Sequence, residues 1–397
     1  MIELSERLNA MEESATLAMA RLSRELKAQG KDIISLSLGE PDFNTPQFIK
    51  DAAVVGLEQN FTTYTPVSGY DDLRERISHK FMRDNGLNYP KEQIVVSTGA
   101  KQSIANVVLS LINPGDEVII PAPYWVSYIE IVKMAGGIPV VIHAGIDQDF
   151  KINATQFEAA ITPKTKLFIF SSPCNPTGSV YTKEELRGLA DVLVKHPDLI
   201  ALSDEIYEHI RFEGTHESIA QFDFIKERVI IVNGVSKGYA MTGWRIGYIG
   251  ASKEIAKACD KMQGQFTSAA SSIAQKAAVK AISTDWSEYE YMRDLFLKRR
   301  NLVLDLMSQI PGWKFNKPKG AFYVFPDVTY FFGKSDGETT IKTASDLCMY
   351  LLKEAKVSLV TGEAFGDDRC IRISYATSEE ILTEALTRIK SALAKLQ

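Results

Sequence analysis

The chain has 397 residues, of which 45% are hydrophobic and 24% are charged, and its formal net charge is −5. A chain of this length and composition has room for two to three domains with sizeable cores, and its composition excludes wholesale disorder. The acidic balance, with a pI of about 5.7, argues against a nucleic-acid partner because phosphate binding requires clustered Lys and Arg.

The N-terminal stretch and the cysteines predict a cytoplasmic location. "MIELSERLNAMEESATLAM" lacks the basic and then apolar segments of a signal peptide. No apolar run reaches the length of about 18 residues that a membrane span needs, so we expect none. The four cysteines form no CxxC pair, which favours reduced thiols. Neither an HExxH motif nor a zinc-like spacing of Cys and His occurs, so no metal site is expected.

Short apolar runs alternate with helical patterns between residues 94 and 250. Strands are predicted for "QIVVSTG", "DEVIIPAP", "TKLFIFSSP", "DLIALSDE", "RVIIVNGV" and "WRIGYIGA". Helices are predicted for "AKQSIANVVLSLI", "YWVSYIEIVKMAGG" and "TKEELRGLADVLVKH", the last opened by the capping-box pair Thr182 and Glu185. Strands that are apolar on both faces and separated by helices predict an α/β fold with a mainly parallel sheet covered on both sides.

The pattern changes near residue 285. A charged amphipathic helix at 285–309 leads to "GAFYVFPDV", a helix near 343–355, "VSLVTG", "CIRISYA" and a last helix at 378–396. This order is typical of a smaller α+β domain. The first part of the chain, a helix followed by "IISLSLGEPDF", is expected to pack with it. We therefore predict a large domain at 45–284 and a smaller, discontinuous domain made of 1–44 and 285–397.

Unusual polar residues fall where the predicted strands end, which is the edge at which function collects in parallel sheets. Lys237 stands alone among small residues in "VNGVSKGYAMTGWRIGYIG", and Arg245 follows eight positions later. Burial and nearby positive charge lower the pKa of a lysine and prepare it to attack an aldehyde. We hypothesise that Lys237 holds a cofactor as a Schiff base and that Arg245 holds its phosphate; the ordinary alternative is a solvated lysine in a Gly-rich turn.

Three further segments fit this hypothesis. Asp204 ends an apolar strand, where its carboxylate could pair with a protonated pyridine nitrogen. Tyr207, and Asn175 in "SSPCNPTG", could donate hydrogen bonds to the phenolic oxygen of that ring. The turn "STGAKQS" places small residues at a helix start, which suits a phosphate. The ordinary alternatives are an N-cap aspartate with a core tyrosine, simple turn chemistry and a plain Gly-rich turn.

In this order along the chain, these segments resemble class I aminotransferases of subgroup Ib, which include many bacterial aspartate aminotransferases. The resemblance runs from about Leu8 to the end and is carried by "GEPDFNTP", "YTPVSGYDDLR", "PAPYWVSY", "SSPCNPTG", "SDEIYEH", "NGVSKGYAMTGWRIGY", "GAFYVFP" and "IRISYATSEE". It implies the fold type I of enzymes that depend on pyridoxal 5'-phosphate. It also implies ping-pong transamination, with L-aspartate and 2-oxoglutarate giving oxaloacetate and L-glutamate.

The resemblance further implies roles for individual residues. Catalysis would rest on Lys237, as the Schiff-base lysine and proton shuttle, together with Asp204 and Tyr207. The cofactor would be bound by Gly99, Ala100, Lys101, Trp125, Asn175, Asp204, Tyr207, Ser236, Lys237 and Arg245. The substrate would meet Gly39, Lys101, Trp125, Asn175 and Arg372, the last as the bidentate clamp of its α-carboxylate. Tyr64 would reach the phosphate in the neighbouring subunit, which implies a homodimer with shared active sites.

Residue types alone leave alternatives open at several of these positions. Trp125 could be a core aromatic residue, Gly39 could end a strand, and Tyr64 could lie in a surface turn. Arg372, inside the apolar run "CIRISYA", needs a buried partner in any case. Cys174 is not expected to be a nucleophile, because no histidine lies near it in the sequence.

Two positions depart from the pattern of the family. Gly234 stands where some members have a serine that binds the phosphate, so Ser236 or the 97–103 turn must contribute more. Glu12 stands where relatives that transaminate prephenate have a basic residue, and its charge is expected to repel the second carboxylate of prephenate.

Other functions remain open on the same scaffold. These are an aminotransferase of broader or aromatic specificity, a pyridoxal-phosphate-dependent C–S β-lyase and a non-catalytic sensor. Lys101 and Arg372 together favour a dicarboxylic substrate. The acidic pI and the lack of a basic N-terminal helix-turn-helix speak against a DNA-binding sensor.

Overall fold

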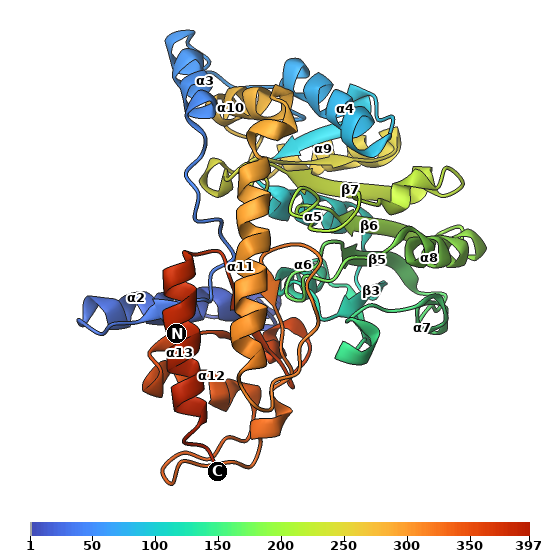
Figure 1. Cartoon of the computed structure of the whole chain (residues 1–397). Helices are drawn as coiled ribbons and strands as arrows, with labels where there is room; N and C mark the ends of the chain where they lie inside the picture. The colour runs from blue at the N-terminus through green and yellow to red at the C-terminus, as the bar shows by residue number, and fades with distance from the viewer. Residues whose placement is uncertain (1) are drawn as a thin grey trace.

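The computed structural model describes residues 2–397 and centres on a seven-stranded sheet (Figure 1). In spatial order its strands are β2 (Ile94–Ser97), β8 (Gly247–Gly250), β7 (Val229–Gly234), β6 (Ile200–Asp204), β5 (Thr165–Ser171), β3 (Glu117–Ala122) and β4 (Ile138–His143). Among these strands, β8 alone runs antiparallel to its neighbours. The predicted fold, a mainly parallel sheet of fold type I, is confirmed.

The edge strand β4 is not among the strands that the sequence predicts. It follows a Gly–Gly pair and contains Pro139, which cannot donate a hydrogen bond to a neighbouring strand. β4 pairs with β3 alone, in a parallel register that sets Pro139 beside Val118. A proline is tolerated at the edge of a sheet, and this position explains how the segment can be a strand.

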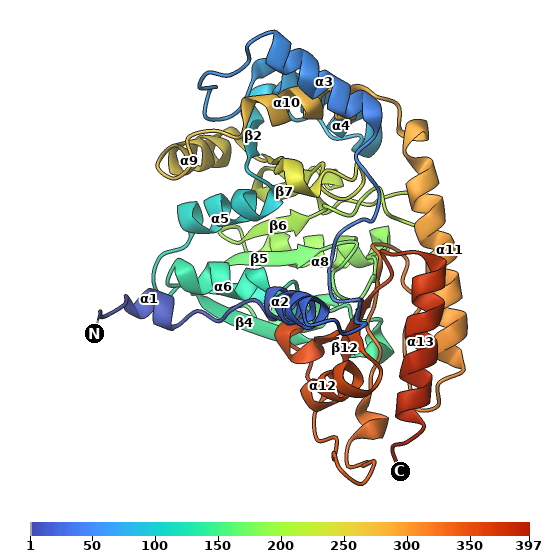
Figure 2. The same cartoon turned by 90° about the vertical axis from the view of Figure 1, so that its left-hand side faces the viewer.

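Helices cover both faces of the large sheet. On one face lie α5 (Ala100–Leu111), α6 (Ser127–Met134) and α9 (Lys253–Gly264), and on the other lie α3 (Gln47–Glu58), α4 (Asp71–Asn85), α7 (Ala154–Ala159), α8 (Lys183–Lys195) and α10 (Ser272–Ser283) (Figure 2). Side chains of one strand alternate between the two cores: Leu167 and Ile169 join the first, and Phe168 and Phe170 join the second. Burial on both sides accounts for the continuous apolar runs of these strands.

A separate core combines the C-terminal part with the N-terminal segment. Its strands are β1 (Ile34–Ser35), β9 (Tyr323–Val324), β10 (Val357–Ser358) and β12 (Ile371–Ser374), and its helices are α12 (Ala344–Glu354) and α13 (Glu379–Leu393). The N-terminal helix α2 (Ala15–Ala28) contacts β10 and the adjoining strand β11 (Val360–Thr361). β1 pairs in parallel with β10, so the two ends of the chain meet here. The long helix α11 (Glu290–Ser308) packs on α13 and extends to the large sheet (Figures 1 and 2). The domain boundaries given above stay predictions.

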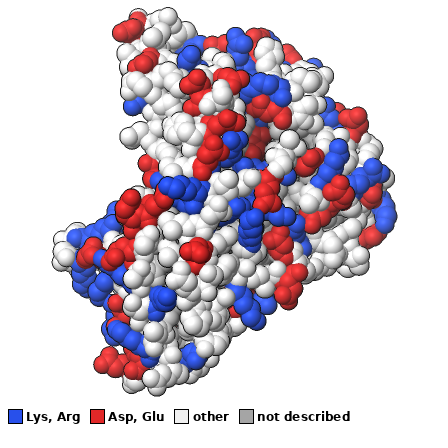
Figure 3. Space-filling view, in the orientation of Figure 1, with Lys and Arg blue, Asp and Glu red and all other residues white. Residues whose placement is uncertain are grey.

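The surface charges and the helices bear on two predictions of the sequence analysis, namely that the protein has no nucleic-acid partner and no membrane span. On the face shown in Figure 3, basic and acidic side chains are interspersed rather than gathered by sign. Such a mixed surface offers no continuous basic track for a phosphate backbone on that face. Within residues 2–397, each helix is too short or too polar to cross a membrane.

Candidate active site

The loops after β2, β3, β5, β6 and β7 meet at one edge of the large sheet, because these strands run in the same direction. A cavity of about 380 Å³ opens there. All the predicted site residues except Gly99 and Tyr64 line it: Gly39, Ala100, Lys101, Trp125, Asn175, Asp204, Tyr207, Ser236, Lys237, Arg245 and Arg372. Segments from 39 to 372 in the sequence therefore form one site.

Lys237 follows β7 and presents its amine to this cavity. Its Nζ donates a hydrogen bond to the carbonyl oxygen of Gly39, at 2.5 Å. Burial lowers the pKa of Lys237 to about 8, an effect that Glu40 opposes and Arg372 reinforces. An amine with a lowered pKa is partly neutral near physiological pH, as nucleophilic attack on a carbonyl carbon requires.

Asp204 ends β6 as a buried carboxylate whose partners are neutral. Tyr128 donates its hydroxyl proton to Oδ2 at 2.7 Å, and the backbone N–H of Ile206 donates to Oδ1 at 3.2 Å. Burial raises the pKa of Asp204 to about 6, and both hydrogen bonds oppose that rise. Because a buried anion is costly without a counter-charge, this point of the cavity favours a cationic group of a ligand.

Tyr128 is a site residue that the sequence reasoning missed. It lies in the first turn of α6, three positions after Trp125, and the two rings meet edge to face with centroids 5.5 Å apart. Trp125 lies just before this helix, and the backbone N–H of Tyr128 donates to its carbonyl oxygen at 3.0 Å, which brings the two residues together. That spacing, in "PAPYWVSY", is the signal that could have identified it.

Arg372 is a buried guanidinium on β12 whose protein partners are uncharged. Its Nη1 donates to Oδ1 of Asn175 at 2.9 Å, and its Nη2 donates to the carbonyl oxygen of Ser37 at 2.5 Å. Its Nε has no hydrogen-bond partner within residues 2–397. The ring centroid of Tyr323 lies 4.7 Å from the guanidinium carbon. A buried cation of this kind favours an anionic ligand.

Tyr323 is a second residue that the sequence reasoning missed, although it lies in the quoted segment "GAFYVFP". Its hydroxyl lies 2.8 Å from that of Tyr207. Burial raises the pKa of Tyr207 well above its usual value, so Tyr207 keeps its proton. A Cβ at Gly39 would collide with the hydroxyl of Tyr323, so glycine allows the backbone at this position to lie close to that ring.

The turn before α5 is shaped by two glycines. Gly99 has φ +84°, and a Cβ there would collide with the guanidinium of Arg245. A Cβ at Gly247 would collide with the backbone nitrogen of Ala100. The arginine thus lies directly against the start of the helix, where free backbone N–H groups and the helix dipole attract anions.

Replacing Gly99 with alanine is expected to lower the free energy of unfolding by about 1–3 kcal/mol, because the backbone conformation suits glycine and the new methyl group displaces Arg245. Gly243→Ala is the matched control, since a Cβ there meets nothing within 4 Å and its φ is not positive. Denaturant unfolding of both variants checks the prediction, and equal stability of the two would contradict it.

The structure also explains the departure at Gly234. A Cβ at this position would lie 2.7 Å from the carbonyl oxygen of Ile246 and 2.9 Å from the Cα of Gly247. A serine cannot be accommodated between β7 and β8 without moving the backbone. Ser236, two positions later, is one of the serines that line the cavity.

Tyr64 and Glu12, which the sequence analysis also singled out, lie outside the cavity of Lys237. Tyr64 is 97% exposed. Glu12 lines a neighbouring cavity of about 740 Å³, which shares Lys101 and Arg245 with the first. The backbone N–H of Glu12 donates to the carboxylate of Glu130 at 2.9 Å.

Comparisons with known proteins agree with this geometry. The family described as aminotransferase class I and II matches residues 31–389. An aspartate/prephenate aminotransferase of Nitrosomonas europaea is 45% identical over 99% of this chain and 100% of its own length. An aspartate aminotransferase of Geobacillus stearothermophilus is 46% identical over 98% of each chain.

Solved structures extend the likeness to the fold. The aspartate aminotransferase from Rhizobium meliloti has a TM-score of 0.97 and 42% identity, with 100% of both chains covered. The enzyme from Thermus thermophilus with maleate has a TM-score of 0.93 and 40% identity, over 99% of this chain and 100% of that one. The chain belongs to the aminotransferases of classes I and II.

Proposed function

We propose that the protein is a pyridoxal-phosphate-dependent enzyme that transfers the amino group of L-aspartate to 2-oxoglutarate. The observation that carries the proposal is the meeting of three groups in one cavity. They are the amine of Lys237 with its lowered pKa, the carboxylate of Asp204 with neutral partners, and the guanidinium of Arg372, whose Nε has no partner in the described part of the chain. Each would meet a complementary group of cofactor or substrate.

The phosphate end of the cofactor fits the turn at the start of α5. Gly99 leaves the space in which the guanidinium of Arg245 lies against this turn, so a charge-assisted bond would add to the backbone donors of Ala100 and Lys101. Ser236 lines the same cavity, and its hydroxyl would be a further donor. These residues would hold the phosphate.

The pyridine ring of the cofactor fits the part of the cavity that is lined by Asp204, Tyr207 and Asn175. Asp204 would pair with the protonated ring nitrogen. Tyr207 and Asn175 would donate to the phenolic oxygen, since Tyr207 keeps its proton and the amide nitrogen of Asn175 is not used by Arg372. Trp125 would stack on the ring as a rigid aromatic face, and Nζ of Lys237 would hold the aldehyde carbon covalently.

The chemistry then follows from where protons and charges can be held. Pyridoxal phosphate, when bound, supplies an electron-withdrawing ring that weakens the bond to the α-proton of an amino acid. Once the amino group of the substrate has displaced it from the aldehyde carbon, Nζ of Lys237 would take that proton, because a pKa of about 8 leaves a neutral fraction near pH 7. It would then return the proton to the former aldehyde carbon, which leaves the amino group on the cofactor. Asp204 would keep the ring nitrogen protonated. Arg372 would grip the α-carboxylate with two parallel N–H groups and so orient the α-proton toward Lys237.

Lys101 supports a dicarboxylic substrate. Its Nζ lies 5.0 Å from the ring centroid of Trp125, and both residues line the cavity. Partial burial and the charge of Arg245 hold the pKa of Lys101 below its usual value. A second carboxylate on the substrate would supply the missing counter-charge. The acidic Glu12 lines the adjoining cavity, and its effect against prephenate stays a prediction.

A panel of amino acids tests the assignment. With purified protein and pyridoxal phosphate, we expect the single-turnover half-reaction to be fastest with aspartate and glutamate. Arg372→Lys keeps the positive charge but loses the planar fork, and we expect kcat/KM for every amino acid to fall by about 100-fold. Arg369→Lys, at a half-exposed arginine paired with Asp367, is the matched control. A uniform panel, or equal losses in the two variants, would contradict the assignment.

We also propose a cytoplasmic homodimer with shared active sites. Tyr64 is exposed together with Val54, Val55 and Leu57 of α3. Exposed apolar side chains in one region favour burial by a partner, and Tyr64 would then complete the phosphate site of the second copy. Sedimentation should give a species of twice 44.2 kDa. A monomer with full activity would contradict shared sites.

A further inference from the structure

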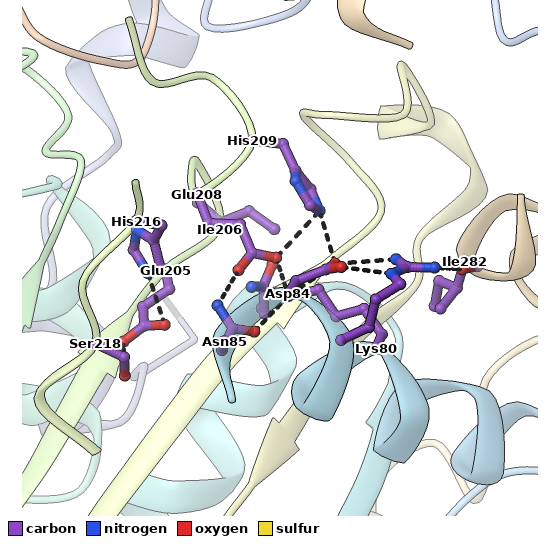
Figure 4. Close-up of polar contacts among 12 residues, drawn as sticks. Lys80, Asp84, Asn85, Glu205, Ile206, Glu208, His209, His216, Ser218 and Ile282 are labelled. Carbon is purple, nitrogen blue, oxygen red and sulfur yellow. Dashed lines mark hydrogen bonds and ion pairs between the residues drawn. The ribbon is translucent and has the colours of Figure 1, made fainter. Parts of the chain in front are cut away.

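Buried charged side chains gather at the turn after β6, where Glu208 and His209 meet residues of α4 (Figure 4). Asp204 and Tyr207 line the cavity of Lys237. Between and after them come Glu205 and Glu208, which are 1% and 5% exposed and lie outside that lining. Buried carboxylates need partners, and those of Glu208 come from α4.

Glu208 is held by two residues of α4. Lys80, which is fully buried, forms an ion pair with Glu208 through its Nζ. Nζ also donates to Oδ1 of Asn85 at 2.9 Å, and Nδ2 of Asn85 donates to Oε2 of Glu208 at 3.0 Å. Burial alone would raise the pKa of Glu208, but the ammonium of Lys80 holds it below its usual value. The carboxylate is therefore charged at neutral pH.

The next residue connects this cluster to the loop of Lys237. Nε2 of His209 lies 3.2 Å from Oε1 of Glu208 and 3.3 Å from the hydroxyl of Tyr239, two residues after Lys237. The ring of His209 stacks on Trp286, with centroids 4.0 Å apart and planes 15° apart. Burial lowers the pKa of His209 to about 4, so its ring is neutral. Lys80 and Asn85 thus hold Glu208 in the 205–209 turn, and His209 of the same turn contacts the loop of Lys237 through Tyr239.

A bound metal ion is a weaker explanation of these carboxylates. Glu205, Glu208 and His216 bring potential ligand atoms within 4.8 Å of one another. However, the ammonium of Lys80 already supplies the cation at Glu208, and Nε2 of His216 lies 2.9 Å from Glu205. Side chains of the protein itself therefore already contact both carboxylates.

We propose that Lys80 and Glu208 are positioning residues, whose ion pair fixes the 205–209 turn and thereby sets Asp204 and Tyr207 relative to Lys237. A buried ion pair adds little net stability over an apolar pair of similar volume, because both ions lose their hydration. Its effect is therefore expected on geometry more than on stability. The inference rests on the proposed function of Asp204, Tyr207 and Lys237.

The test compares Glu208→Gln, the double variant Lys80→Met with Glu208→Gln, and the control Lys151→Met. The double variant leaves no charge of the pair uncompensated and so guards against misfolding. Lys151 forms ion pairs with Asp149 and Glu185, away from the turn. We expect both Glu208 variants to lower kcat by about 10- to 100-fold, since small misplacements have effects of this size, and to leave KM for aspartate within about threefold.

Crystal structures of the cofactor-free variants provide a second readout. We expect the contacts of 2.7 Å between Tyr128 and Asp204 and of 2.8 Å between Tyr207 and Tyr323 to lengthen or break in both Glu208 variants. They should persist in Lys151→Met. If Glu208→Gln does not fold, the double variant decides alone.

Two outcomes would overturn the inference. In one, the two contacts and kcat of the Glu208 variants stay as in the wild type, and only the melting temperature falls, as it does in Lys151→Met. This result would show that the ion pair has a merely structural role. In the other, the turn moves and kcat does not change. A wild-type protein that neither takes up pyridoxal phosphate nor transaminates would refute the proposed function instead, and the crystal comparison would still decide whether the pair positions the turn.

Discussion

Lys237→Ala is expected to lower the rate of transamination by about 10⁴-fold, the upper range for loss of a positioned acid–base group. The variant loses the amine that would hold the cofactor and take the α-proton. Within residues 2–397, Lys237 is the lysine whose Nζ contacts the carbonyl oxygen of Gly39, at 2.5 Å, so no other lysine stands ready at this point to replace it. Borohydride treatment of the wild type should fix a pyridoxyl group on the peptide that contains Lys237. The variant should give no such adduct.

Lys237→Arg tests the role of the amine separately from the role of the positive charge. Arginine keeps a positive group in the cavity but remains protonated at any working pH, so it can neither attack a carbonyl carbon nor accept the α-proton. We expect this variant to be as inactive as the alanine variant. Added methylamine should restore part of the activity of the alanine variant only, because it can enter the space left by the side chain. Normal turnover in either variant would refute the role of Lys237.

The convergence of the residues that we propose to hold the cofactor could be predicted, because these residues are local features of the sequence. Strand ends, a Gly-bounded turn and an isolated lysine are visible in short segments, and parallel strands must bring their carboxyl ends to one edge. Lys237, Asp204 and Asn175 therefore fall where the order of strands places them. The apolar runs also predict burial on both faces of the sheet.

The rest of the site depends on contacts between distant segments. Tyr323 meets Tyr207 across 116 positions, and Lys80 meets Glu208 across 128. No periodicity or turn residue marks such pairs in one sequence. A buried lysine in the polar helix "DDLRERISHKFMRDN" looks like any solvated lysine until the helix is placed against the turn after β6. Packing, and not local propensity, decides these contacts.

Asp204→Asn is expected to lower kcat by about 100- to 1,000-fold, the range for removing one pre-oriented electrostatic group. The asparagine has nearly the same shape but no charge, so it cannot hold the proton on the ring nitrogen. Tyr128→Phe is the matched variant, because it keeps the carboxylate and removes the hydrogen bond of 2.7 Å to Oδ2. We expect a smaller loss of kcat in Tyr128→Phe, since the charge of Asp204 survives.

The two variants also differ in how pH affects cofactor uptake by the cofactor-free protein. Burial raises the pKa of Asp204 to about 6 and the hydrogen bond from Tyr128 lowers it, so Tyr128→Phe should raise it further. Protonation of Asp204 removes the anion that pairs with the ring, and affinity for pyridoxal phosphate therefore falls as pH falls through this pKa. The fall should begin at a higher pH in Tyr128→Phe than in the wild type, and the contribution of Asp204 should be absent in Asp204→Asn. Identical pH profiles for the wild type and Tyr128→Phe would show that this carboxylate does not meet the ring nitrogen.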